Sequence, residues 1–159
     1  MTKGEIAKNN FLKGYNCCQS VLLAFCEDLG IDEKTALMLS SPFGGGMGRL
    51  REVCGAVSGM FMVLGLAKGY CDPTDKSAKT RVYAEVQQLA ERFEKANGSI
   101  ICRDLLQLRS KQKDEPVPSD RTGEYYKTRP CKELCEFSAN LLAEYLDTQP
   151  STSARNSSR

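Results

Sequence analysis

Cysteine is the residue type in this chain with the widest chemistry. Eight cysteines are spread over 159 residues, and the chain has no histidine. The absence of histidine removes the commonest metal ligand and the usual general base, so Ser/His and Cys/His catalysis are excluded. Free thiols in such numbers, in a chain read as cytoplasmic, are typical of metal ligands or redox groups.

Four of the cysteines are predicted to share one electrostatic setting. Each stands at or near the beginning of an expected helix, where unpaired amide groups and the helix dipole favour a thiolate. These four are Cys17, Cys54, Cys102 and Cys131. We interpret them as candidate catalytic redox thiols or, alternatively, as the ligands of one metal.

The remaining cysteines give weaker signals. Cys18 and Cys26 lie near the apolar stripe of one expected helix, and we interpret them as small buried hydrophobes. Cys135 follows Cys131 by four residues and so shares its helix face, which makes the two a weak candidate pair of metal ligands. Cys71 falls in an expected turn and carries no signal.

A glycine-rich stretch precedes the most apolar part of the chain. It predicts a loop, because glycine loses more backbone entropy in a helix than any other residue. The stretch lacks the Lys-Ser/Thr of a phosphate-binding loop and follows no expected strand, so we expect it to let backbone approach a neighbouring helix or a bound group. The candidate cofactor-binding glycines are Gly44, Gly45, Gly46 and Gly55.

The apolar run over 53–67 predicts a buried central helix. At 15 residues it is shorter than the roughly 20 residues that span a bilayer, so we expect no membrane interaction. Gly55 and Gly59 lie on one face of this helix, where another backbone can come close. That face suits either an intrachain contact or a homodimer.

The periodicity of apolar residues predicts an all-α fold. We expect one domain over 1–147, a compact bundle of about six helices, followed by a disordered tail over 148–159. The polar, proline-rich segment over 111–130 is expected to lack regular structure. Besides the central helix, the expected helices cover 2–14, 17–29, 33–40, 73–96, 99–108 and 131–146.

Charge and the N-terminal sequence limit the partners. The formal net charge is +2 and neither sign forms a long block, so nothing indicates nucleic-acid binding. The first 14 residues lack the apolar core and cleavage site of a signal peptide, which predicts a cytoplasmic protein.

Taken in order, these motifs resemble those of a known family, the C-GCAxxG-C-C family of putative redox-active proteins, over 11–142. The sequence has CGAxxG in place of the literal GCAxxG at 54–59. The resemblance implies that Cys17, Cys54, Cys102 and Cys131 are the four signature cysteines. The motifs that carry it are Gly14-Tyr15-Asn16-Cys17, Phe43-Gly44-Gly45-Gly46, Cys54-Gly55-Ala56-Val57-Ser58-Gly59, Asn97-Gly98-Ser99-Ile100-Ile101-Cys102-Arg103-Asp104-Leu105 and Cys131.

Two kinds of chemistry fit a four-cysteine site. The thiolates could hold an iron–sulfur cluster or another soft metal. Alternatively, two thiols could cycle between dithiol and disulfide with an unknown redox partner, activated by a helix start and by Arg49, Arg51 or Arg103. The rival hypothesis is a structural or interaction module with a zinc site or with buried, inert cysteines. No catalysed reaction is identified by these residues.

Overall fold

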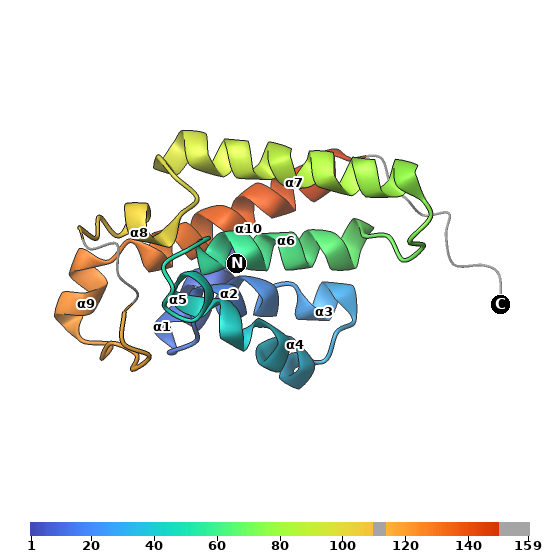
Figure 1. The fold of residues 1–159 in the computed structure, drawn as a ribbon. Helices are drawn as coiled ribbons and strands as arrows, with labels where there is room; N and C mark the ends of the chain where they lie inside the picture. The colour runs from blue at the N-terminus through green and yellow to red at the C-terminus, as the bar shows by residue number, and fades with distance from the viewer. Residues whose placement is uncertain (110–113, 150–159) are drawn as a thin grey trace.

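A computed structural model describes residues 1–109 and 114–149, and over these residues the fold is all-α, as predicted (Figure 1). The only β-type contact among them is one isolated bridge. The elements are α1 (Lys3–Leu12), α2 (Cys17–Leu23), α3 (Cys26–Leu29), α4 (Glu33–Ser40), the 3₁₀ turn η1 (Ser41–Phe43), α5 (Gly44–Met47), α6 (Gly55–Lys68), α7 (Lys76–Asn97), α8 (Cys102–Leu105), α9 (Gly123–Thr128) and α10 (Cys131–Thr148).

The predicted central helix, α6, lies in the core. It packs against α2, α7 and α10, while α1 packs against α2 and α10. Most of its larger apolar side chains are buried against these neighbours, although Leu66 is exposed, and removal of such side chains from water is the main stabilising contribution to folding. Both α6 and α10 begin at the end of the bundle where α5, α8 and α9 gather, at the left of Figure 1.

The predicted helix over 17–29 is in fact two helices. The chain leaves the α-helical pattern after Leu23, where the amides of Ala24 and Phe25 donate to carbonyls only three residues back, at 3.2 and 3.1 Å. Such bonds tighten the turn and end the regular helix. α3 then ends at Gly30, whose left-handed backbone caps it as expected.

The prediction of no regular structure over 111–130 is wrong for the segment that forms α9. Thr122 caps this helix by accepting a hydrogen bond from the amide of Tyr125 at 3.2 Å. The rings of Tyr125 and Tyr126 pack against Phe11 with centroid separations of 6.5 and 6.3 Å. A local cap and a tertiary aromatic contact therefore stabilise a short helix in a polar segment.

The other boundaries differ in smaller ways. The helix expected over 99–108 is a single turn, α8, which ends before Gln107 adopts a left-handed φ of 55°. α10 extends through Thr148, and the rest of the predicted tail, from 150 onward, lies outside the described residues. Within those residues no helix combines the length and the apolar character needed to span a bilayer.

Candidate thiol site

Cys54 and Cys102 are brought together by two short extended segments. The amide of Cys54 donates to the carbonyl of Ile100 at 2.8 Å, and the amide of Cys102 donates to the carbonyl of Glu52 at 2.7 Å. These bonds flank the isolated antiparallel bridge. The same segments immediately precede α6 and α8, so one backbone pairing places both helix starts, and both thiols, side by side.

Glycines on α6 bring Cys17 to the same place. A Cβ atom on Gly55 would lie 2.9 Å from the carbonyl oxygen of Phe43 and 3.0 Å from the Cβ of Cys17. A Cβ on Gly59 would lie 2.9 Å from the carbonyl oxygen of Cys18. Only glycine permits this approach of α6 to α2. The face predicted for a close backbone contact is therefore used inside the chain, and a homodimer would need another surface.

α10 adds two further thiols to the group. Cys131 occupies its first turn, and its thiol is near enough to that of Cys17 for the two to shift each other's pKa. Cys135, one turn later, donates to the Cys17 carbonyl oxygen at 3.8 Å. The structure thus gathers the four predicted cysteines and adds Cys135. The spacing of Cys135 from Cys131 predicted that the two share a helix face. That spacing did not indicate that Cys135 would contact Cys17.

All five thiols are buried, and this corrects the expectation that helix starts favour thiolates here. Interaction with the Cys131 thiol lowers the pKa of Cys17, but interaction with the Cys135 thiol and burial together raise it well above its ordinary value. Burial raises the pKa of Cys54 to about 12. Interaction with the Cys17 thiol, together with burial, strongly raises the pKa of Cys131. Desolvation of a thiolate therefore outweighs the helix dipole.

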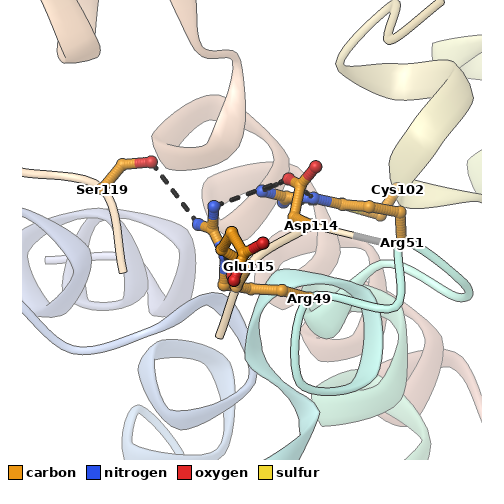
Figure 2. Close-up of polar contacts among 6 residues, drawn as sticks. All are labelled: Arg49, Arg51, Cys102, Asp114, Glu115 and Ser119. Atoms are coloured by element: carbon orange, nitrogen blue, oxygen red, sulfur yellow. Dashed lines mark hydrogen bonds and ion pairs between the residues drawn. The ribbon is translucent and has the colours of Figure 1, made fainter. Parts of the chain in front are cut away.

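Cys102 differs because a cation contacts its sulfur. Arg51, only 4% exposed, donates from Nη1 to the Cys102 Sγ at 3.5 Å and from Nε to Asp114 Oδ2 at 2.7 Å (Figure 2). Burial raises the pKa of Cys102, whereas the hydrogen bond and the charge of Arg51 oppose that rise. Of the three arginines proposed to activate a thiol, Arg51 makes this contact, while Arg49 donates to the Glu115 carbonyl and to Ser119.

The loop that holds Arg51 has an unusual backbone. Gly45 and Gly46 adopt the left-handed φ values of 70° and 69° that the glycine-rich sequence predicts. Three residues with side chains, Met47, Arg49 and Arg51, also have φ between 62° and 67°. Left-handed backbone costs such residues roughly 1 kcal/mol each, so the loop persists only because its contacts hold it there.

The glycines proposed to bind a cofactor have two different roles. Gly44 and Gly45 line a cavity of about 270 Å³. Gly46 and Gly55 are packing positions, because a Cβ on Gly46 would lie 2.5 Å from the Cys102 Cβ and one on Gly55 would meet α2. Glycine is needed at these two positions because the backbone there lies close to the cysteines.

Three of the five thiols face this cavity. Cys17, Cys102 and Cys131 belong to its lining, at 9%, 7% and 7% exposure, whereas Cys54 and Cys135 do not. Arginines supply most of its polar lining: Arg49, Arg51, Arg121 and Arg129. Arg121 and Arg129 were not identified from the sequence, because both lie in the segment over 111–130 that was expected to be irregular.

The five thiols are potential metal ligands. Thiolates suit iron–sulfur clusters, zinc and other soft metals. Within 1–109 and 114–149, however, no three cysteine, aspartate or glutamate side chains are arranged so that they could hold one ion. The arrangement of the five thiols therefore does not fit a metal site.

The remaining cysteines lie elsewhere and are all free thiols. Cys18 is buried beside Met62, with a sulfur–sulfur distance of 3.7 Å. Cys26 is buried and donates to the Leu22 carbonyl at 3.5 Å. Both agree with the interpretation of small buried hydrophobes. Cys71 is exposed.

Comparisons with known proteins agree with the resemblance seen in the sequence. Neither the curated proteins nor the solved structures include a match to this chain. The family model described as "Putative redox-active protein (C_GCAxxG_C_C)" matches residues 15–145, most of the chain and all five clustered cysteines. The chain therefore belongs to the C_GCAxxG_C_C family.

Proposed function

We propose that this protein is a thiol–disulfide redox protein in which Cys17 and Cys131 are the reactive pair. The observation that carries the proposal is that both thiols belong to the lining of one cavity that is also lined by cations. A disulfide needs two sulfur atoms that can approach within bonding distance, and these two thiols are near enough to shift each other's pKa. The family description as redox-active supports the same class of chemistry.

The reaction is a two-electron oxidation. Cys17 and Cys131 each give up a thiol proton, one S–S bond forms, and two electrons pass to an external oxidant. The attacking sulfur must first become a thiolate, and burial opposes that step at both residues. Arg121 and Arg129 favour the charged form of Cys131 and so reduce this cost. The proposed centre is therefore slow to react in the free protein.

The cellular setting is part of the proposal. A cytoplasmic location would keep the pair reduced at rest, because cytosolic thiol buffers oppose stable disulfides. Association with a redox partner, and a homodimer through a surface other than the Gly55–Gly59 face, are proposals of the same kind.

The test is disulfide mapping in defined thiol–disulfide buffers. The protein is purified under reducing conditions without a histidine tag, equilibrated over a series of potentials, alkylated and mapped by mass spectrometry. We expect a Cys17–Cys131 bond that forms and breaks reversibly. Cys17→Ser and Cys131→Ser abolish it while helical circular dichroism is retained, and Cys26→Ser, a buried cysteine outside the cluster, leaves it unchanged.

Metal and acid-labile sulfide are measured on protein that is purified in the same way and without oxygen. Stoichiometric iron with sulfide would overturn the dithiol proposal in favour of a cluster. Stoichiometric zinc, or thiols that stay reduced over the whole series, would support the structural module instead.

A further inference from the structure

The cavity beside the reactive pair carries an excess of positive charge. Its four arginines contact one carboxylate between them, Asp114, which pairs with Arg51 at 2.6 Å and with Arg49 at 3.5 Å. Among residues 1–109 and 114–149, neither Arg121 nor Arg129 forms an ion pair. Two guanidinium groups therefore stand at the cavity wall with their charge uncompensated by a carboxylate.

Arg121 is held rigidly in place. Its guanidinium carbon lies 4.0 Å from the centroid of the Phe11 ring and 5.1 Å from that of Tyr125. Its Nη1 and Nη2 donate to the carbonyl oxygens of Phe11 and Tyr15 at 3.0 and 3.2 Å. These contacts use two of its five N–H donors and fix the plane of the group.

Arg129 contacts the same Tyr125 ring as Arg121. Its guanidinium carbon lies 5.5 Å from the centroid of that ring. The charge of Arg129 acts on both Cys131 and Cys102, which places it close to the thiols. Both arginines are partly buried, and arginines that stack on aromatic rings are suited to bind planar anions through two parallel hydrogen bonds.

The size of the cavity limits its occupant. A volume of about 270 Å³ lies just below the roughly 300–1,000 Å³ that is usual for small-molecule sites. Such a cavity suits a compound of amino-acid size.

We propose that this cavity binds a small disulfide that carries carboxylate groups, with Arg121 and Arg129 as the carboxylate anchors. The inference rests on the proposed function, because it names the oxidant of the Cys17–Cys131 pair. Small thiols derived from cysteine carry a carboxylate, so their disulfides present an anion and an S–S bond in one compound. The lining of the cavity contains both the cations that could bind the anion and the two thiols that could react with the S–S bond.

The exchange balances in atoms and electrons. One thiol of the pair attacks the substrate disulfide as a thiolate, a mixed disulfide forms, and the first substrate thiol leaves with a proton. The second protein thiol loses its proton and attacks the mixed disulfide, releasing the second substrate thiol. In sum, protein dithiol and one small disulfide become protein disulfide and two small thiols.

Binding is tested separately from redox chemistry with thiodiglycolate, a dicarboxylate whose central thioether cannot exchange. Titration calorimetry on the reduced protein is expected to show one binding site. Arg129→Gln weakens binding by about tenfold or more, because it removes a charge-assisted hydrogen bond. Arg121→Lys keeps the positive charge but removes the planar set of guanidinium donors, and it is also expected to weaken thiodiglycolate binding. Arg92→Gln, a surface arginine on α7, is the control.

Oxidation is then compared between dithiodiglycolate and hydroxyethyl disulfide, which have similar size and differ in charge. We expect dithiodiglycolate to form the Cys17–Cys131 bond at least tenfold faster, and Arg129→Gln to remove the difference. No thiodiglycolate binding with equal rates for both disulfides would overturn the inference and leave the proposed function intact. If thiodiglycolate binds but neither reagent forms the Cys17–Cys131 bond, the proposed function is overturned, together with the oxidant proposed for it. The anion-binding site would then still be supported.

Discussion

A buried thiol needs help to lose its proton, and the cysteines of this cluster receive it unequally. Burial opposes ionisation of all five, but within the described part of the chain only the Cys102 sulfur accepts a hydrogen bond from a guanidinium. Arg51 is in turn oriented by Asp114, whose pKa its hydrogen bond lowers. The pair acts as a unit in which Asp114 positions the cation and the cation stabilises the thiolate.

Replacing Arg51 by glutamine is expected to slow alkylation of Cys102. Without the cation the pKa of Cys102 rises further, so less thiolate is present at any pH below it. The rate of iodoacetamide modification at pH 8 should fall by up to about tenfold, since hydrogen bonds to charged groups contribute about 1.5 kcal/mol or more. Mass spectrometry of the Cys102 peptide measures the rate.

Arg49→Gln is the matched control for this experiment. Arg49 also contacts Asp114, at 3.5 Å, and also has a left-handed φ, but it makes none of the hydrogen bonds to a sulfur that Arg51 makes. An equal loss of reactivity in both variants would mean that loop distortion, and not the hydrogen bond to Cys102, controls the thiol.

At the scale of elements, the cluster depends on how closely α6 approaches α2. Glycine at positions 55 and 59 removes the side chains that would otherwise separate the two helices. The same approach sets Cys54, at the start of α6, beside Cys17, at the start of α2. One helix–helix contact therefore determines both the packing of the core and the assembly of the thiols.

Gly55→Ala is expected to destabilise the protein by about 1–3 kcal/mol, the usual cost of overpacking a core. The added methyl would lie 2.9 Å from the Phe43 carbonyl oxygen and 3.0 Å from the Cys18 amide, and backbone atoms cannot move aside cheaply. Gly65→Ala on the same helix meets no atom within 4 Å. We expect it to stabilise by about 0.5–1 kcal/mol, because alanine has the higher helix propensity.

Urea unfolding of both variants measures these changes. Equal effects of the two substitutions would show that the approach of α6 to α2 is not the constraint at position 55.

For the whole molecule, burial of the thiols links stability to pH. Burial raises the pKa of Cys18 and of Cys54 to about 12 each. In the unfolded chain a cysteine ionises near pH 8.5. Between these values the unfolded chain has fewer bound protons than the folded one, so stability is complete below about pH 8 and falls as the pH rises toward 12.

Each such thiol adds about 1.4 kcal/mol per pH unit to the loss of stability in that window. Cys18→Ala should therefore flatten the dependence of the unfolding free energy on pH by about this amount between pH 9 and 11. Urea titrations in the presence of a non-thiol reductant measure the slope. Cys71→Ala, at an exposed cysteine, is expected to leave the slope as it is. A slope that is the same in all three proteins would contradict the proposed linkage.

Local sequence determined much of the secondary structure and the position of each cysteine within it. Asn16 with Gln19 forms the predicted capping box, so Cys17 begins α2. Pro130 precedes α10, and Cys131 begins it. These signals act within one helical turn, which is why they can be read without a fold. The break after Leu23 and the helix α9 were not predicted. The break depends on which carbonyl groups the amides of Ala24 and Phe25 bond to, and α9 depends on aromatic packing against a distant residue.

The tertiary structure alone decided what the cysteines can do. Burial reversed the expected effect of the helix starts on thiol pKa, since desolvation depends on contacts from distant elements. Asp114 lies 63 residues from Arg51 in the sequence, and Arg121 contacts Phe11, 110 residues away. No local sequence pattern therefore indicates the arginine contact to Cys102 or the cationic cavity. The sequence alone determined the residues that could react; long-range packing, which excludes water and joins charges, determined their environment.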